Sequence, residues 1–288
     1  MASSFEVTES SFVNARDLKI YTRKYIPRDS YSIVLLFLHG IGEHCSRYDA
    51  SFSTLATEGI AVYAMDHQGH GRSDGARFDC GHFSEFIEDI LAFNDILRAD
   101  HASHPGVKII VSGISFGGLL AAVTAATQPR QFDGLLLYAP AIGIEMTWTL
   151  WVQNLFAGVL EALIPSWQVV PAVNVALLSR NTAFVEDYVT DPLNDHSNLR
   201  VRLALSVKRG MDHLAKIKDS IRMPVLVFHG DLDRVTSPEI SKAFFDALAT
   251  PSKTYTSLKG QWHCLLNEPE AGGTMAASLD WLKARAKL

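Results

Sequence analysis

Short runs of consecutive apolar residues recur along the chain and alternate with amphipathic segments. Such runs occupy residues 33–38, 60–65, 108–112, 134–138 and 224–229. Strands buried on both faces of a parallel sheet are continuously hydrophobic, so these runs predict its central strands. Residues 84–101 instead carry apolar side chains every three or four positions, from Phe86 to Ile96, which predicts an amphipathic helix. Strand followed by helix, repeated, indicates an α/β fold.

Two segments depart from this alternation. Residues 5–27 alternate apolar and polar positions around short turns, which predicts antiparallel strands at the edge of a mixed sheet. About 85 residues separate the runs ending at Tyr138 and beginning at Pro224, although a parallel crossover needs only a dozen or so. We therefore predict a mostly helical cap over residues 142–218, inserted between two parts of the core, 1–141 and 219–288.

The predicted cap is unusually apolar. It contains Trp148, Trp151 and Trp167, which are three of the five tryptophans in the chain. These side chains either pack against the sheet or face lipid, and the sequence leaves both interpretations open. No window of about 20 residues here is free of polar breaks, so a membrane span is not expected.

The composition of the chain limits which binding partners and which cellular location are expected. Hydrophobic residues make up 48% of the chain and the net charge is −5, without a cluster of Lys and Arg. Nucleic acid is therefore not an expected partner. The N-terminus lacks the pattern of a secretory signal, so the cytoplasm is the expected location. Cys45, Cys80 and Cys264 have no metal-ligand spacing and are expected to be reduced thiols. The oligomeric state stays open.

One serine is bracketed by glycines in the stretch GISFG, residues 113–117. An apolar run precedes it and an unbroken helical pattern follows. Glycines two positions before and after Ser115 permit a sharp turn from strand into helix, which presents the hydroxyl at the carboxyl edge of the sheet. Ser115 is therefore the candidate nucleophile, although a glycine-rich turn with an inert serine is the simpler alternative.

A serine nucleophile needs a base that a carboxylate orients, in the chain order Ser, Asp or Glu, His. Downstream of Ser115, His196 and His213 fall in the predicted cap, and His229 precedes its nearest aspartates. His263 is therefore the candidate base.

The carboxylate is expected in the loop after the penultimate strand. HGDLDRV, residues 229–235, offers Asp231 and Asp233 there. We favour Asp233, although spacing alone does not separate the two.

Acyl transfer also requires donors for the developing oxyanion, and backbone N–H groups commonly supply them. One donor is expected from Phe116, directly after the nucleophile. The other is expected from Ile41 in the turn HGIG, residues 39–42, which follows the first long strand. A tight turn with no such role is the alternative for this segment.

Several motifs together resemble the monoacylglycerol lipase and lysophospholipase-like branch of the serine α/β-hydrolases. The resemblance spans about residues 15–285 and rests on HGIGEHCSRY, DHQGHGRSDG, GISFGG, LLSRNTAFVEDYVTDPL, HGDLDRV and the WH of QWHC. It implies an α/β-hydrolase fold with a mostly parallel sheet, flanking helices and an inserted, mainly helical cap. It also supports Asp233, because the acid of this family aligns with the second aspartate of HGDLDRV.

The resemblance further implies hydrolysis of monoacylglycerols to fatty acid and glycerol through an acyl-enzyme, with no metal or organic cofactor. The cap would line an acyl channel and touch the membrane surface, and Glu43, Arg47 and Tyr188 would surround the glycerol end. Without the resemblance, these three would be interpreted as a solvated charge pair and an ordinary tyrosine. A lysophospholipase or broad carboxylesterase is the alternative activity, followed by an acyltransferase or a non-catalytic ligand receptor.

Three positions depart from the pattern of that family. Ile114 and Phe116 stand where the family usually has His and Met, and Leu266 stands where the animal enzymes have a second His. An oxyanion N–H survives these changes, whereas the shape of the pocket changes with them.

Overall fold

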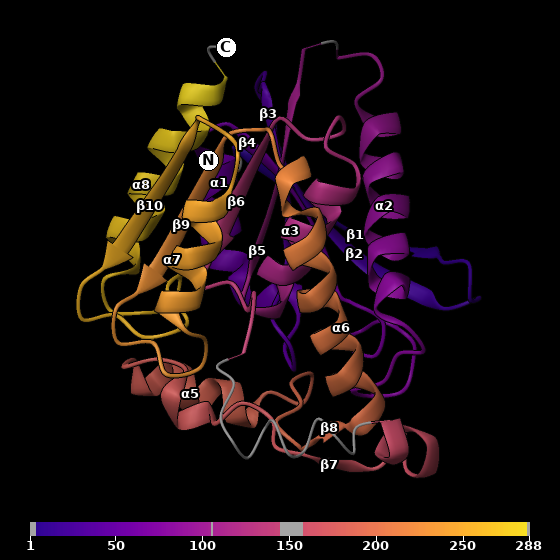
Figure 1. The fold of residues 1–288 in the computed structure, drawn as a ribbon. Helices are drawn as coiled ribbons and strands as arrows, with labels where there is room; N and C mark the ends of the chain where they lie inside the picture. Colours follow the sequence, from indigo (N-terminus) through magenta and orange to yellow (C-terminus); the bar gives the residue numbers. More distant parts are fainter. Residues whose placement is uncertain (1–3, 105, 145–157, 287–288) are drawn as a thin grey trace.

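The structure, a computed structural model, describes residues 4–104, 106–144 and 158–286. Its centre is an eight-stranded sheet with the strand order β1-β2-β4-β3-β5-β6-β9-β10 (Figure 1). The strands are β1 (Phe5–Val13), β2 (Lys19–Pro27), β3 (Ile33–Leu38), β4 (Ile60–Met65), β5 (Lys108–Ile114), β6 (Gly134–Tyr138), β9 (Val225–Gly230) and β10 (Lys253–Leu258).

The direction of the strands agrees with the hydrophobic pattern. From β4 to β10 every neighbouring pair is parallel, whereas β1 pairs with β2 and β2 with β4 in antiparallel fashion. β3 and β4 have the predicted bounds and are buried along their whole length. The prediction of a parallel centre with antiparallel edge strands is therefore confirmed.

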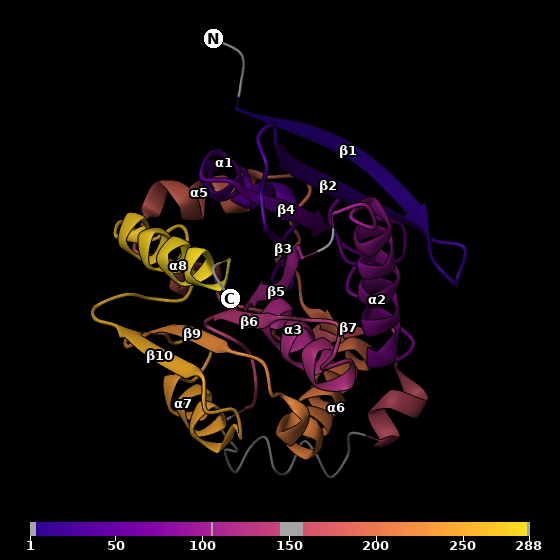
Figure 2. The same cartoon turned by 90° about the horizontal axis from the view of Figure 1, so that it is seen from above.

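Helices cover both faces of this sheet (Figure 2). On one face α2 (Phe83–Asp100), α3 (Phe116–Thr127), α6 (Val201–Ile217) and α7 (Pro238–Ala247) enclose one apolar core. On the other face α1 (Asp49–Thr57) and α8 (Ala271–Arg285) enclose a second core, which contains Phe52 and Leu282. The helix predicted at 84–101 is α2, displaced by one residue.

Between β6 and β9, the described residues that precede α6 lie at the carboxyl ends of the parallel strands (Figure 1). The segment between β6 and β9 contains β7 (Gln168–Val170), η2 (Val175–Leu177), α5 (Thr182–Thr190), β8 (Leu199–Arg200), α6 and η3 (Lys218–Ser220). β7 and β8 form a separate two-stranded antiparallel sheet.

The last helix of the predicted cap range, α6, packs along α3. Its Leu203 and Leu214 belong to the same core as α2 and α3. The division at 142–218 stays a prediction. Trp148 and Trp151 lie outside the described residues, whereas Trp167 is 60% exposed. Within the described ranges, no helix combines the length and the apolar composition needed to cross a membrane.

Candidate active site

Ser115 lies between β5 and α3, in a turn that requires glycine two positions before it and two positions after it. Its backbone has φ 54° and ψ −120°, a left-handed φ that is rare for a residue other than glycine. A Cβ at Gly113 would lie 2.2 Å from the Gly117 carbonyl oxygen, and one at Gly117 would lie 2.1 Å from that of Leu38. The two glycines therefore let β5, α3 and β3 approach closely enough to form the turn.

His263 and Asp233 form a buried pair, although 30 positions separate them. His263 Nδ1 lies 2.8 Å from Asp233 Oδ2, and both side chains are at most 3% exposed. Because the carboxylate only accepts hydrogen bonds, Nδ1 carries the proton and Nε2 is left as the basic nitrogen. Asp231, the other candidate, is exposed, and its Oδ1 accepts the Gly260 N–H at 2.6 Å.

Asp233 is held as an anion by the groups around it. Its Oδ1 accepts the N–H groups of Val235 (2.7 Å) and Thr236 (3.1 Å), and its Oδ2 accepts the Thr236 hydroxyl (2.8 Å). Burial opposes the charge, but attraction to His263 and the hydrogen bonds of His229 and His263 outweigh it and lower the pKa of Asp233. The carboxylate is therefore ionised at neutral pH.

Ser115 and His263 line the same small cavity. Its volume is about 20 Å³, close to the space one water molecule needs. The remaining lining residues come from the loop after β3, from Ile114, and from the segments around η2, α5 and His263: Gly40, Ile41, Glu43, Tyr48, Val173, Leu178, Tyr188 and Cys264. The structure thus brings the candidate nucleophile and the candidate base to one enclosed space, with a proton acceptor on His263 for the serine hydroxyl.

The two candidate oxyanion donors come from a residue next to Ser115 in the chain and from a residue that lines the same cavity. Phe116 is the first residue of α3, where the N–H has no partner within the helix. Ile41 lines the cavity from the loop after β3. In that loop the N–H of Gly40 donates to Glu43 Oε1 at 2.6 Å, which holds the turn that presents Ile41.

Glu43 and Tyr188 reach the same cavity, and both are buried. Glu43 Oε1 accepts the Tyr48 hydroxyl at 2.6 Å, and burial raises the pKa of Glu43 despite this bond. The Tyr188 hydroxyl donates to the Gly42 carbonyl at 3.1 Å. The alternative interpretation of Glu43 as part of a solvated charge pair is therefore wrong, because packing buries its side chain.

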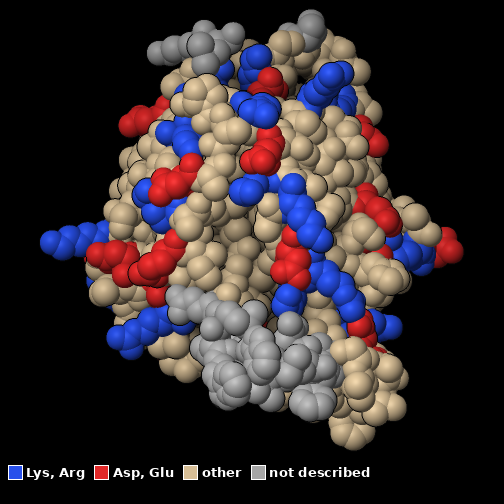
Figure 3. Space-filling view, in the orientation of Figure 1, with Lys and Arg blue, Asp and Glu red and all other residues tan. Residues whose placement is uncertain are grey.

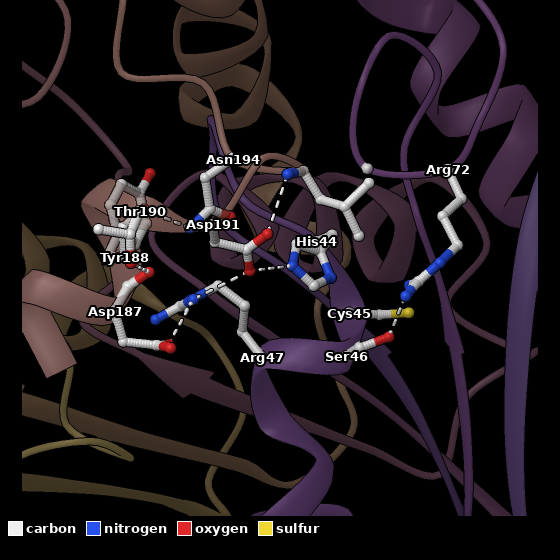
Figure 4. A network of polar contacts seen from close by, with 12 residues as sticks. His44, Cys45, Ser46, Arg47, Arg72, Asp187, Tyr188, Thr190, Asp191 and Asn194 are labelled. Atoms are coloured by element: carbon white, nitrogen blue, oxygen red, sulfur yellow. Dashed lines mark hydrogen bonds and ion pairs between the residues drawn. The ribbon is translucent and has the colours of Figure 1, made fainter.

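Arg47 does not line the cavity. Its Nη1 lies 3.0 Å from Asp187 Oδ2 and 3.2 Å from Asp191 Oδ2, and its side chain is only 4% exposed (Figure 4). Its guanidinium lies against the rings of Phe184 and Tyr188, 4.9 and 5.1 Å from their centres. Arg47 thus joins the loop after β3 to α5.

His44 strengthens the same connection. Its Nε2 lies 2.9 Å from Asp191 Oδ2, on the oxygen that also faces Arg47 (Figure 4). Burial would raise the pKa of Asp191, but the His44 hydrogen bond and other donors lower it overall. Neither His44 nor Asp191 had a predicted role, although Asp191 belongs to the motif LLSRNTAFVEDYVTDPL.

His229 and Thr236 also contact the candidate acid, although neither had a predicted role. His229 Nε2 lies 3.2 Å from Asp233 Oδ2, so the histidine set aside as a base touches the candidate acid. Its place at the end of a buried strand, four residues before Asp233, is the signal that was available.

Three further histidines, His39, His67 and His70, form a buried cluster in the loops after β3 and β4. The rings of His39 and His67 are 4.1 Å apart, and His39 Nε2 accepts the N–H of His67 at 3.0 Å. Burial lowers the pKa of His67 to about 3. In the described part of the chain, no group of three or more His, Cys, Asp or Glu residues is arranged to hold a metal ion. Cys45, Cys80 and Cys264 are free thiols, and all three are buried.

A mostly parallel sheet, helices on both faces and a strand–serine–helix turn define an α/β hydrolase. The chain belongs to the family described as serine aminopeptidase S33, which matches residues 30–270. The predicted fold class is confirmed.

Known relatives extend over nearly the whole chain. A monoacylglycerol lipase of Mycolicibacterium smegmatis is 29% identical over 281 residues, with 96% of each chain covered. The human monoglyceride lipase is 28% identical over 275 residues, 95% of this chain and 89% of that protein. The crystal structure of a monoacylglycerol lipase from Paleococcus ferrophilus is similar with a TM-score of 0.77 and 29% identity, covering 97% and 99% of the two chains. The chain is thus a monoacylglycerol lipase-like α/β hydrolase.

Proposed function

We propose that this protein is a serine hydrolase that cleaves monoacylglycerol esters into fatty acid and glycerol. The observation that carries the proposal is the pairing of His263 with Asp233 at the cavity that Ser115 also lines. The relatives named above support the substrate class.

In the proposed mechanism, Ser115 is the nucleophile and His263 acts first as a base and then as an acid. His263 Nε2 takes the proton of Ser115 Oγ as that oxygen attacks the ester carbonyl. The N–H groups of Ile41 and Phe116 stabilise the resulting oxyanion. His263 then returns the proton to the leaving glycerol oxygen, which leaves an acyl-enzyme.

Water completes the reaction by the same groups. His263 removes a proton from the water that attacks the acyl carbonyl, and the proton passes to Ser115 Oγ as the fatty acid leaves. Asp233 orients His263 and stabilises its imidazolium form, while remaining ionised itself. No step in this sequence requires a cofactor.

We propose that the glycerol end of the substrate meets Glu43 and Tyr188, because both line the cavity beside Ser115. Arg47 is assigned a different role, since Asp187, Asp191 and two aromatic rings already surround its guanidinium. The cavity of about 20 Å³ is smaller than an acyl chain, so we expect Val173 and Leu178 to move when substrate binds.

A substrate panel tests the proposal. Monoacylglycerols of several chain lengths, lysophospholipids and short aryl esters are compared with wild-type protein and Ser115→Ala. We expect monoacylglycerols to be turned over fastest, and the variant to fold normally while losing at least about a thousandfold in kcat. Faster turnover of lysophospholipids or short aryl esters would favour a lysophospholipase or carboxylesterase. Product analysis with added alcohols distinguishes an acyltransferase, and failure of a fluorophosphonate probe to label Ser115 would indicate a ligand receptor.

We also propose peripheral contact with membranes through the segment 158–170. Val159, Leu163 and Trp167 are 55, 75 and 60% exposed, and the only charged residue of this segment, Glu161, pairs with Arg209. An uncharged bulge occupies the lower right of the molecule in Figure 3. An exposed apolar surface of this kind favours an interfacial role. The cytoplasm remains the predicted location.

Vesicle flotation measures this contact. The double variant Leu163→Ser with Trp167→Ser is expected to lose association with phosphatidylcholine vesicles. Val13→Ser, which removes a 66% exposed side chain from the edge strand β1, serves as the matched control. Equal flotation of all three proteins would mean that the segment does not contact lipid.

A further inference from the structure

Asp233 contacts two histidines, His263 and His229. Its Oδ2 is 2.8 Å from His263 Nδ1 and 3.2 Å from His229 Nε2. His229 belongs to β9, is fully buried and does not line the cavity that contains Ser115. We propose that His229 is a positioning residue: it shares the charge of Asp233 with His263 and thereby limits the basicity of His263. This inference rests on the proposed function of Ser115, Asp233 and His263.

The hydrogen-bonding pattern determines the protonation of His229. Its Nε2 faces a carboxylate oxygen, which only accepts, so Nε2 carries a proton. Its Nδ1 is buried and has no partner among the described residues. A proton on Nδ1 would leave an unsatisfied buried N–H, which is costly. His229 is therefore a neutral donor to Asp233.

The remaining contacts leave Asp233 little freedom to turn. Two backbone N–H groups hold Oδ1, and the Thr236 hydroxyl approaches Oδ2 from the same loop. His229 is the donor on Oδ2 that comes from the sheet itself. It anchors the carboxylate to β9, and β9 is a rigid element beside β6 and β10.

Each donor stabilises the charged form of the carboxylate, and donors that share one oxygen compete for its negative charge. Loss of His229 would concentrate that charge on His263 and favour its imidazolium form. The titratable groups near Asp233 are then His229 from β9, Tyr255 from β10, and His263 with Cys264 from the loop after β10.

Three substitutions separate this role from simple packing. His229→Gln keeps an amide N–H near the position of Nε2, His229→Leu removes the donor, and His229→Asn stays polar but is too short to reach Asp233. The measurement is the pH dependence of kcat/KM and of kcat for hydrolysis of a monoacylglycerol. Each protein is first checked for folding and for the fraction that a fluorophosphonate probe labels.

We expect His229→Gln to stay within about threefold of wild type at every pH. His229→Leu and His229→Asn should lose about tenfold or more in kcat at neutral pH. In the pH profile of kcat/KM, the acidic limb of these two variants should shift to higher pH by about 0.5 to 1 unit. Their KM should change less than about twofold, since His229 does not touch substrate. Should the Leu variant fail to fold, the Asn variant carries the comparison.

The inference is overturned if the acidic limb stays at its wild-type position in the folded Leu or Asn variant. It is also overturned if His229→Gln behaves like those variants. Failure of the proposed function has a different signature, because Ser115→Ala would then keep activity and the probe would not label wild-type protein. If the probe labels Ser115 normally and the pH profile of the His229 variants is unchanged, the role of His229 is refuted and the proposed function is not.

Discussion

Arg47 and Asp191 lie 144 positions apart in the chain, and Arg47 Nη1 lies 3.2 Å from Asp191 Oδ2. The same carboxylate oxygen lies 2.9 Å from His44 Nε2. Through these contacts the loop after β3, which carries Ile41 and Glu43, is tied to the end of α5. The position of the candidate oxyanion donor therefore depends on a segment from the other half of the chain.

Asp191→Asn is expected to loosen this connection, because it removes the charge that both Arg47 and His44 face. We expect the free energy of unfolding to fall by about 1 to 3 kcal/mol and KM to rise more than kcat falls. Chemical denaturation and steady-state kinetics measure the two effects.

Asp187→Asn is the matched control, since Asp187 pairs with the same Nη1 but its side chain is 73% exposed. An ion pair whose carboxylate is mostly exposed to water contributes less than about 1 kcal/mol, so this variant should resemble wild type. If both variants behaved alike, the burial of Asp191 would not matter and the proposed connection would be incorrect.

Gly117→Ala is expected to disrupt the turn at Ser115. The new Cβ would lie 2.1 Å from the backbone oxygen of Leu38, which cannot move without displacing β3. We expect a loss of about 3 kcal/mol or more in stability, together with loss of activity. Gly272→Ala in α8, where a Cβ meets nothing within 4 Å, should be neutral or stabilising by up to about 1 kcal/mol. Thermal unfolding of both variants provides the comparison.

The two aspartates of HGDLDRV are expected to differ sharply. Asp233→Asn should reduce kcat on the order of 10³- to 10⁴-fold, because an amide beside His263 Nδ1 favours the wrong tautomer. Asp231→Asn should stay close to wild type, since its carboxylate is exposed and accepts the Gly260 N–H. A comparable loss in both would reopen the assignment of the acid. Kinetics at saturating substrate decide between them.

The buried histidines predict that the fold weakens in acid. Burial lowers the pKa of His67 to about 3, whereas the unfolded chain titrates near the ordinary value of about 6.5. Between these values the unfolded state binds a proton that the folded state does not, so stability falls as the pH decreases. Each such group contributes a slope of up to about 1.4 kcal/mol per pH unit.

Urea denaturation of wild type and His67→Gln between pH 7 and pH 4 measures this contribution. The Gln amide can still donate to the His39 carbonyl, as His67 Nε2 does at 3.1 Å. We expect a shallower loss of stability in the variant. If the free energy of unfolding fell equally with pH in both proteins, His67 would not be the source of this acid sensitivity.

Local features of the sequence determined the framework of the site. Six apolar residues in a row at 33–38 and at 60–65 mark β3 and β4 without error, because burial on both faces requires that pattern. The turn at Ser115 was equally visible, since its two glycines lie two positions before and two positions after the serine in the chain. The choice of His263 followed from chain order, and the structure places it beside Asp233 and in the cavity with Ser115.

Only the tertiary structure decided which polar side chains from distant segments contact one another. Nothing near Arg47 in the sequence indicates that α5 will surround it, and chain order set His229 aside although it touches Asp233. Hydrophobic periodicity reports whether a position is buried, because it reflects the repeat of a single strand or helix. It carries no information on which two polar groups meet, since that depends on how whole elements pack.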